Sequence, residues 1–421
     1  MSILVVGVHH RSAPLEVLED LAVAPIDLPK MLARITDSSE VREAVLLSTC
    51  QRIEVYADVS RFHTALEHVL EVVCESGNRT LHDVAPYFST WYDDGAADHL
   101  FSVAAGIDSL VVGESEILAQ VKQAAEAAES EGTLGRSLRP LFRHALEAAK
   151  RVRSETGISH GAASVASAAV ALVREVSSFE GSPVAVVGAG RAATSAAKAL
   201  MSAGASELVV VNRTATAGQT LAAREGGRWV AFESLASVLR EAAVVICSTA
   251  ATRPILTPGL IASAMAGREG RPLALIDIAL PRDVHPDVAS IPGVTVVGLD
   301  DVRARAAATT DRRHAEVLRG TKIVGEEVER WRLALAMRGV DPAVKALRSQ
   351  AEAIAATEFE RRAGRLSDLS AGELAEVEAL VRAVVRKLVH SPTAALRTHA
   401  ADPDSAALVE AAAILFDLEI D

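Results

Sequence analysis

Between about residue 160 and residue 300, short apolar runs alternate with stretches of helical periodicity. Strands joined by crossover helices form parallel sheets with helices on both faces. The pattern therefore predicts a parallel sheet in the middle of the chain. Its predicted strands are Val184–Gly188, Leu208–Asn212, Val244–Thr249, Leu273–Ala279 and Val294–Leu299.

The flanking parts of the chain follow different patterns. Residues 1 to about 150 mix short strands and helices that are separated by prolines and glycines. From about residue 302 the periodicity is only helical, and residues 303–338 hold no proline and only two glycines. We expect one long helix there, and a pause at Gly339-Val340-Asp341-Pro342 where a helical bundle begins. The sequence predicts an α/β multidomain protein with sections at 1–150, 160–300 and 303–421.

One cysteine lies where an apolar run meets an alternating strand. Ala44–Leu47 predicts a buried strand, and Arg52–Ala57 alternates polar and apolar residues as a half-buried strand does. Cys50 therefore stands at the end of an element, close to Arg52, and a nearby cation raises the thiolate fraction of a thiol. Cys74 and Cys247 lie in apolar runs, as small core residues do. Local context leaves Cys50 as either a nucleophile or a core residue.

The central section contains a G-x-G-x-x-A turn between a strand and a helix. In such a turn the first glycine allows the tight bend, the second admits a pyrophosphate, and the alanine packs the helix on the strand. Amides at the helix N-terminus bind the phosphates. This turn predicts a dinucleotide site formed by Gly188, Ala189, Gly190, Arg191, Ala192 and Ala193.

The end of the next strand bears on which dinucleotide binds. It reads Asn212-Arg213-Thr214, where NAD enzymes usually carry an acidic residue for the ribose 2′-hydroxyl. Arg213 and Thr214 suit a 2′-phosphate, which favours NADP over NAD. The alternative is that Arg213 is a surface turn residue.

Composition narrows the class of protein. The 421 residues carry a net charge of −12, from 43 basic and 55 acidic residues, which disfavours a general nucleic-acid binder. The basic segment 136–153 is either a local RNA contact or a solvated helix face. Three cysteines without paired spacing argue against disulfides and structural zinc, and the histidine spacing shows no metal site. Without a signal peptide or a spanning segment, we expect a soluble, cytoplasmic protein that does not contact a membrane.

A reactive thiol and a hydride donor together indicate one kind of chemistry. Hydride does not readily reduce a carboxylate, but it reduces a thioester. Cys50 would attack an activated acyl group, and NADPH would reduce the resulting thioester to an aldehyde.

With these features the chain resembles a known family, the glutamyl-tRNA reductases of the five-carbon tetrapyrrole pathway. The resemblance rests on segments in the same order along nearly the whole chain. They are Gly7–Pro14, Leu47–Tyr56, His99–Ser109, Gly113–Lys122, Lys150–Thr156, Gly188–Gly190, Asn212–Thr214, Asp277–Asp283 and Lys387–Pro392.

The resemblance implies NADPH-dependent reduction of glutamyl-tRNA(Glu) to glutamate-1-semialdehyde, the first committed step of porphyrin and haem synthesis. It makes Cys50 the nucleophile and His99 a residue important for activity. The alternative is that His99 is an ordinary polar residue on a helix. The implied substrate-binding residues are Thr49, Gln51, Arg52, Ser109, Glu114, Ser115, Glu116 and Gln120. Arg52 is chemically suited to a carboxylate because its planar fork donates two parallel hydrogen bonds.

The family's architecture is a V-shaped homodimer. Each chain has an α+β N-terminal catalytic domain, a Rossmann-type NADP domain, and an all-α dimerisation domain on a long helix. A further implied partner is the downstream glutamate-1-semialdehyde aminomutase.

The chain departs from the family pattern near the thiol. Gln51 replaces the usual asparagine, Ser115 and Glu116 replace Pro-Gln, and Ala119 replaces glycine. Glu116 adds negative charge near a site for an anionic substrate, and a like-charge contact at about 4 Å costs roughly 1 kcal/mol in water. Two alternatives therefore stay open: a non-catalytic relative that binds tRNA or a partner protein, and a shikimate-type NADP dehydrogenase.

Overall fold

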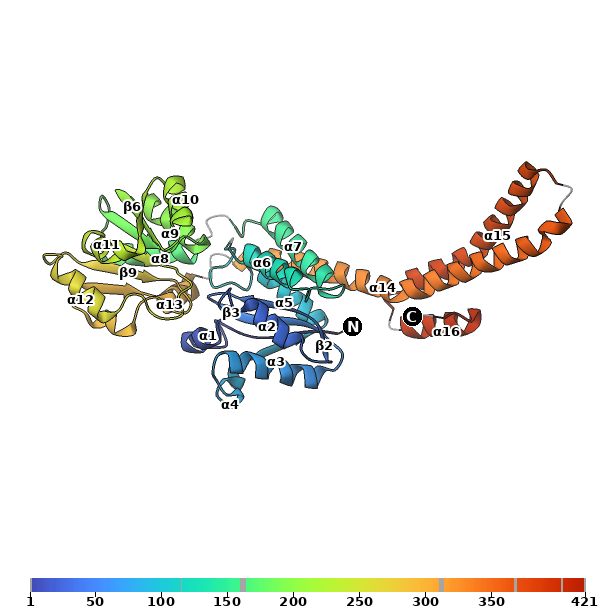
Figure 1. The fold of residues 1–421 in the computed structure, drawn as a ribbon, viewed down its shortest axis with the longest axis horizontal. Coiled ribbons are helices and arrows are strands. Elements are labelled where there is room, and N and C mark those ends of the chain that lie inside the picture. Colours follow the sequence, from blue (N-terminus) through green and yellow to red (C-terminus); the bar gives the residue numbers. More distant parts are fainter. Residues whose placement is uncertain are drawn as a thin grey trace. The chain divides into compact units, whose positions relative to one another are not determined.

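The computed structural model describes residues 2–114, 116–159, 164–309, 314–366, 369–402 and 404–419. The chain divides into two compact units, Met1–Gly325 and Glu326–Asp421. The first unit contains two sheets (Figure 1). We call residues 2–159 the thiol domain and residues 164–309 the nucleotide domain.

The thiol domain is built on a four-stranded antiparallel sheet with strand order β2-β3-β1-β4. The strands are β1 (Ser2–His9), β2 (Val41–Ser48), β3 (Arg52–Val59) and β4 (Ser89–Tyr92). In Figure 1 the sheet lies between α3 on one side and α6 and α7 on the other. The helices of this domain are α1 (Leu15–Leu21), α2 (Leu28–Thr36), α3 (Phe62–Ser76), α4 (Leu81–Val84), α5 (Asp94–Ala104), α6 (Glu116–Ser130) and α7 (Leu138–Glu155).

Strand β3 differs from the prediction of a half-buried strand. All of its eight residues are buried, including Arg52, Glu54 and Tyr56 on the face that looked polar. The prediction was wrong because these side chains satisfy one another by hydrogen bonds beneath the helices that cover that face. Tyr56 also packs edge-on against Phe142 of α7, with ring centroids 5.3 Å apart.

The nucleotide domain contains the predicted parallel sheet, with strand order β10-β9-β8-β5-β6-β7. Its strands are β5 (Pro183–Val187), β6 (Glu207–Asn212), β7 (Arg228–Ala231), β8 (Val244–Cys247), β9 (Leu273–Asp277) and β10 (Val294–Val297). This is the order of a doubly wound dinucleotide-binding fold. Strand β7 was not predicted, since it is a short, partly exposed edge strand that begins with Arg228.

Helices cover both faces of this sheet because its strand residues alternate between two cores. Val184 and Val186 face one core, and Ala185 and Val187 face the other. The first core takes residues from α8 (Val165–Val176), α9 (Arg191–Ser202), α10 (Ala215–Glu225) and α13 (Leu299–Thr309). The second takes residues from α11 (Leu235–Glu241) and α12 (Pro258–Ala266).

The C-terminal part is all helical, as predicted, but its long helix has other bounds. Helix α14 (His314–Ala363) runs for 50 residues and continues through Pro342, so the predicted pause at 339–342 was wrong. Of the long helix predicted from residue 303, residues 303–309 belong instead to α13. Residues 310–313 lie outside the described residues. Val344 is buried in a small apolar core with Leu396 of α15 (Ala371–Thr398) and Ala412 of α16 (Ser405–Phe416). This packing offsets the roughly 3 kcal/mol cost of an internal proline.

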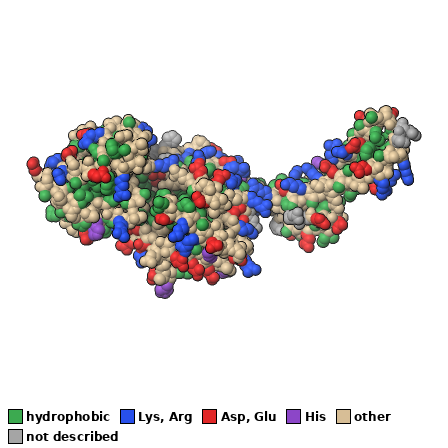
Figure 2. All heavy atoms as spheres, in the orientation of Figure 1, with side chains coloured by type: hydrophobic (Ala, Val, Ile, Leu, Met, Phe, Trp, Pro, Cys, Tyr) green, Lys and Arg blue, Asp and Glu red, His purple; other side chains and the backbone are tan. Residues whose placement is uncertain are grey.

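Two surface properties bear on partners. On the face shown in Figure 2, acidic and basic side chains are interspersed over the first unit. Among the helices that the structure describes, none has the length and apolar character that crossing a bilayer requires.

Candidate active site

Cys50 lies at the tip of the β2–β3 hairpin, and Thr49 holds that turn in place. The Thr49 amide donates to the carbonyl oxygen of Arg52 at 2.8 Å. The Thr49 hydroxyl oxygen accepts hydrogen bonds from the amides of Gln51 at 3.1 Å and Arg52 at 3.2 Å. The thiol is therefore presented by a fixed turn between two buried strands.

A cavity of about 20 Å³ adjoins the thiol. Cavities of this size hold about one water molecule. It is lined by Thr49, Cys50, Gln51, Arg52, Ser109, Glu114, Glu116, Ile117, Gln120 and Val165. The structure thus brings together every predicted substrate-binding residue that it describes, while Ser115 lies outside the described residues. Ile117 and Val165 were not predicted; they are apolar residues without a chemical signal in the sequence.

The surroundings of Cys50 oppose its ionisation. Burial, followed by the charge of Glu114, raises the pKa of the thiol to about 12. The side-chain amide of Gln51, whose nitrogen lies 3.7 Å from the sulfur, acts in the opposite direction. So does the guanidinium of Arg303 on α13. Arg52, which the sequence suggested would favour the thiolate, is not among the largest of these influences, and burial keeps the thiol protonated in the described conformation.

Glu114 is the most perturbed carboxyl group of this cavity. Burial, followed by the charge of Glu116, raises its pKa to about 7. A carboxyl group with such a pKa can hold or release a proton near neutral pH. Glu114 is therefore suited to proton transfer beside the thiol.

Arg52 lines the cavity, but its guanidinium is already paired. Nη1 donates to Glu54 Oε1 at 2.7 Å, and Nη2 donates to the carbonyl oxygen and, at 3.3 Å, to the carboxylate of Asp108. Although burial alone would raise the pKa of Glu54, the charge of Arg52 holds it well below its usual range. A substrate carboxylate would have to share Arg52 with these two acids.

His99 is buried and is not among the residues that line the thiol cavity. Its Nε2 lies 3.0 Å from Glu54 Oε1, and its ring stacks on Trp91 with centroids 3.7 Å apart. Glu54 thus joins His99 to Arg52, and Arg52 belongs to the cavity. The structure connects His99 to the thiol site through this chain of contacts.

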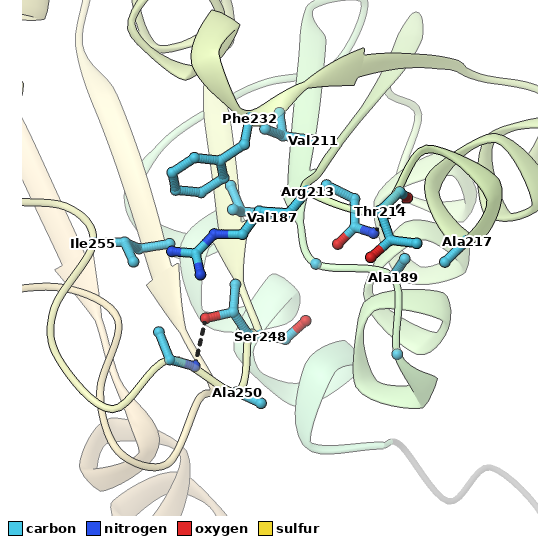
Figure 3. A pocket seen from close by; sticks show the side chains of 15 residues that line it. Val187, Ala189, Val211, Arg213, Thr214, Ala217, Phe232, Ser248, Ala250 and Ile255 are labelled. Carbon is cyan, nitrogen blue, oxygen red and sulfur yellow. Dashed lines mark hydrogen bonds between the residues drawn. The ribbon is translucent and has the colours of Figure 1, made fainter. Parts of the chain in front are cut away.

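A second site lies at the carboxyl ends of the parallel strands. A cleft of about 500 Å³ is lined by Val187, Gly188, Ala189, Gly190, Val211, Asn212, Arg213, Thr214, Ala217, Phe232, Ser248, Thr249, Ala250, Ala251 and Ile255 (Figure 3). Six of the nine predicted cofactor residues line it. Arg191, Ala192 and Ala193 do not; they form the first turn of α9, where Ala193 is buried in the core.

The glycine turn has the space that a dinucleotide requires. Gly188 has a φ of +115°, and a Cβ there would lie 2.7 Å from the carbonyl oxygen of Ser248. A Cβ at Gly190, the residue before α9, would meet no atom within 4 Å. Phosphates can therefore approach the backbone at the start of this helix.

Arg213 points across the cleft toward Phe232, and the guanidinium carbon lies 4.9 Å from the centre of the phenyl ring (Figure 3). Such a cation–π contact restrains the arginine at the mouth of the cleft. The sequence analysis missed Phe232 because it lies beyond the unpredicted strand β7. Ser248 and Thr249 could have been found, since they end the predicted strand Val244–Thr249 at the ligand-binding edge of the sheet.

Among the described residues, two polar side-chain contacts connect the nucleotide domain to the thiol domain, beside the apolar packing of Val111 in the nucleotide-domain core. The Ser195 hydroxyl of α9 donates to the carboxylate of Glu116 at 2.5 Å. Arg282, which follows β9, forms a bidentate ion pair with Glu19 of α1, with nitrogen–oxygen distances of 2.7 and 2.7 Å. Glu116, one of the departures from the family pattern, is thus held by a residue of the other domain.

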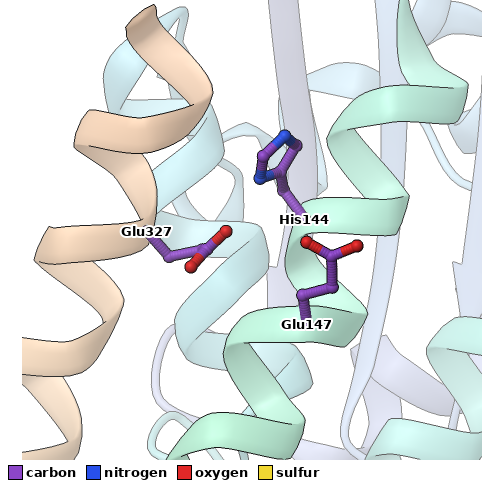
Figure 4. A group of neighbouring side chains, drawn as sticks. All are labelled: His144, Glu147 and Glu327. Carbon is purple, nitrogen blue, oxygen red and sulfur yellow. The ribbon is translucent and has the colours of Figure 1, made fainter. Parts of the chain in front are cut away.

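Helix α7 carries most of the basic segment considered as an RNA contact. Acidic side chains accompany it: Arg143 lies 3.8 Å from Glu147, and Arg151 lies 2.9 Å from Glu155. His144 and Glu147 occupy successive turns of this helix (Figure 4). These pairs reduce the net positive charge of the segment, so the RNA-contact interpretation stays a prediction.

The fold and the two sites define a multidomain α/β protein with a Rossmann-type nucleotide domain and a separate thiol-bearing domain. Comparisons with family models make this class specific. The N-terminal domain of glutamyl-tRNAGlu reductase matches residues 6–156, shikimate / quinate 5-dehydrogenase matches residues 171–304, and the glutamyl-tRNAGlu reductase dimerisation domain matches residues 319–418.

Relatives match the chain over its whole length. Glutamyl-tRNA reductase 1 of a Nocardioides species is 40% identical over 420 residues, covering 100% of this chain and 97% of the relative. The glutamyl-tRNA reductase of Acidothermus cellulolyticus is 38% identical over 425 residues, covering 100% and 88%. The structure of glutamyl-tRNA reductase from Methanopyrus kandleri matches with 32% identity and a TM-score of 0.50, covering 98% of this chain and 99% of that one. The chain belongs to the glutamyl-tRNA reductase family, which confirms the resemblance and the predicted fold class.

Proposed function

We propose that this protein reduces glutamyl-tRNA(Glu) with NADPH to glutamate-1-semialdehyde and free tRNA. The observation that carries the proposal is the position of Cys50. Its thiol lies at a hairpin tip and adjoins a cavity lined by the residues that the family resemblance assigns to the glutamyl group. Family membership over the full chain supports the same substrate.

The proposed reaction begins with acyl transfer to Cys50. The sulfur loses its proton and attacks the ester carbonyl carbon, the carbon–oxygen bond to the ribose breaks, and the freed hydroxyl takes a proton. Glu114 is placed to move that proton, because its pKa of about 7 lets it both accept and donate near neutral pH. The product of this step is a Cys50 thioester and free tRNA.

The second step needs a hydride, which NADPH supplies when bound. The glycine turn, the open space at Gly190 and the strand end at Arg213 fit such a dinucleotide. Arg213 and Thr214 would hold the 2′-phosphate, which would select NADP over NAD. Hydride transfer to the thioester carbon would give the aldehyde, and the Cys50 sulfur would leave as a thiolate and then take up a proton.

We infer three functional sections: residues 1–150 for the thiol chemistry, 160–300 for the nucleotide, and 303–421 for assembly into a homodimer. The match of residues 319–418 to the family's dimerisation domain supports the last assignment. The downstream aminomutase stays a predicted partner, since it would consume the aldehyde product.

The test is NADPH consumption with glutamyl-tRNA, uncharged tRNA and free glutamate as separate substrates. We expect consumption only with the charged tRNA. Cys50→Ser should abolish it, because the variant cannot form a thioester, whereas Cys74→Ala in α3 should retain it. Undiminished reduction by Cys50→Ser would contradict the mechanism.

The same assay separates the two alternatives. A shikimate-type dehydrogenase would oxidise an alcohol irrespective of Cys50; the corresponding family model covers only residues 171–304. A non-catalytic relative would bind the tRNA without consuming NADPH. Gln51→Asn and Glu116→Gln, which restore the usual residues of the family, would then be the first substitutions to make.

A further inference from the structure

Four aromatic rings follow one another beside the turn that carries Cys50. They belong to His10, His9, Trp91 and His99, which come from the end of β1, from β4 and from α5. Ring centroids lie 6.1 Å apart for His10 and His9, 6.0 Å for His9 and Trp91, and 3.7 Å for Trp91 and His99. We call these four residues the ring series. His99 is buried, and the other three are partly exposed.

The backbone places the ring series directly next to the thiol turn. The His10 amide donates to the carbonyl oxygen of Gln51 at 2.8 Å, and His9 pairs with Arg52 across the β1–β3 ladder. Gln51 follows Cys50 in the chain. A ligand lying on the partly exposed rings of His9 and His10 would therefore be adjacent to the nucleophile.

The two histidines are neutral at neutral pH. Burial lowers the pKa of His9 and brings that of His10 to about 3. A neutral imidazole offers a flat aromatic face with one hydrogen-bond donor and one acceptor. The Nδ1 atom of His10 is buried and has no hydrogen-bond partner among the described residues. The Arg11 amide and the Ser89 hydroxyl already lie against the two ring nitrogens of His9. These neutral rings therefore suit the stacking of a heterocyclic base better than the binding of a phosphate.

Positive charge is available beside the ring series. The side chain of Arg11 is 57% exposed and pairs with Asp108 at 2.7 Å, and Asp108 also contacts Arg52. An exposed guanidinium next to neutral aromatic faces matches a nucleotide, whose base stacks while its phosphate meets the arginine.

We propose that the ring series binds the 3′-terminal adenosine of the tRNA, with its base against His9 and His10 and the preceding phosphate near Arg11. This rests on the proposed function, since the ribose of that adenosine carries the glutamyl ester. Proteins commonly recognise unpaired RNA ends by stacking bases on aromatic side chains. The site would place the ester bond beside Cys50.

The test compares the binding of two uncharged RNAs to the full-length protein: tRNA(Glu), and the same tRNA lacking its terminal adenosine. Removing the adenosine should weaken binding to the unmodified protein roughly 5- to 150-fold, the range for one stacked base. His10→Ala should bind both RNAs alike, at the weaker affinity. His10→Phe, which keeps an aromatic face, should restore part of the difference. His63→Ala, on α3, is the matched control and should behave as the unmodified protein.

Equal binding of both RNAs by the unmodified protein would overturn the proposal. So would a His10→Ala variant that still distinguishes them, or one that loses affinity for both by the same factor. The proposed function fails differently. A protein that distinguishes the RNAs but consumes no NADPH with glutamyl-tRNA keeps the nucleotide site and loses the reductase activity, and the reverse result keeps only the reductase.

Discussion

Glu54 is the centre of a buried hydrogen-bond network in the thiol domain. Its carboxylate accepts hydrogen bonds from Arg52 at 2.7 Å and from the Tyr56 hydroxyl at 2.5 Å, and lies 3.0 Å from His99 Nε2. Breaking a buried pair by removing one partner typically costs about 3–5 kcal/mol. Glu54 therefore orients both Arg52, which lines the thiol cavity, and His99, which the family resemblance links to activity.

Glu114 leads to a prediction for stability as a function of pH. Its pKa rises from an ordinary value of 4.5 to about 7 in the folded protein, so the folded state binds the proton more strongly than the unfolded state. Its contribution to the free energy of unfolding is thus largest below pH 4.5 and falls as pH rises to about 7. The loss is roughly 3 kcal/mol, because each pKa unit corresponds to about 1.4 kcal/mol.

Glu114→Gln should remove this dependence. Urea unfolding across that pH window should show the variant gaining stability relative to the unmodified protein as pH rises. Glu126→Gln on α6, which removes a carboxylate that is 57% exposed, is the control and should follow the unmodified protein. Parallel curves for Glu114→Gln and the unmodified protein would show that this carboxyl group is not buried as described.

At the scale of elements, β1 depends on the absence of a side chain at Gly7. A Cβ at that position would lie 2.5 Å from the carbonyl oxygen of Ile53 and 2.6 Å from Cγ of Glu54. The glycine therefore makes the space in which the Glu54 side chain crosses β1. The family resemblance includes Gly7 in the segment Gly7–Pro14 but gives it no role. The space that Glu54 requires is a physical reason for a glycine at this position.

Gly7→Ala should destabilise the thiol domain by about 1–3 kcal/mol, the usual cost of overpacking a buried site. Gly95→Ala is the matched comparison, because a Cβ in that part of α5 meets no atom within 4 Å. It should be neutral or stabilising by up to about 1 kcal/mol. Thermal unfolding of both variants checks the prediction, and equal destabilisation by the two substitutions would contradict it.

The sequence was informative where structure follows from local pattern. The strands of the parallel sheet and the turn at Gly188 were predicted because apolar runs and a glycine at positive φ leave clear signals. Strand β7 was missed because it is short and partly exposed, and the passage of α14 through Pro342 was missed because packing against α15 and α16 decides it. For the same reason the sequence could not reveal that Arg52 is neutralised by Glu54 and Asp108, since Asp108 is far from it along the chain.

At the scale of the whole molecule, the size of the cavity next to Cys50 limits what the described conformation can bind. About 20 Å³ admits a water molecule, not a glutamyl group. The walls include Val165 of α8 in the nucleotide domain, and Glu116 is bound by Ser195 of the same domain. Substrate binding therefore requires the cavity to widen, and because both domains line it, we expect movement of the nucleotide domain to change access to the thiol.

Assembly is the remaining property at this scale, and α15 supports a prediction for it. Leu380, Val384 and Leu388 recur at intervals of four residues and are 64%, 51% and 70% exposed in the single chain. Side chains four residues apart share one face of a helix, and an apolar stripe of this kind is suited to burial against another helix. Because residues 319–418 match the family's dimerisation domain, a second copy of the chain is the expected partner.

Leu388→Glu should place a charge in that interface and shift the protein from dimer toward monomer in sedimentation equilibrium. Arg386→Glu, which falls on the opposite face of α15, is the control and should leave the dimer intact. The thiol domain belongs to the other compact unit, so Cys50 should keep its alkylation rate in both variants. A Leu388→Glu protein that sediments as the unmodified protein does would show that this stripe is not the dimer interface.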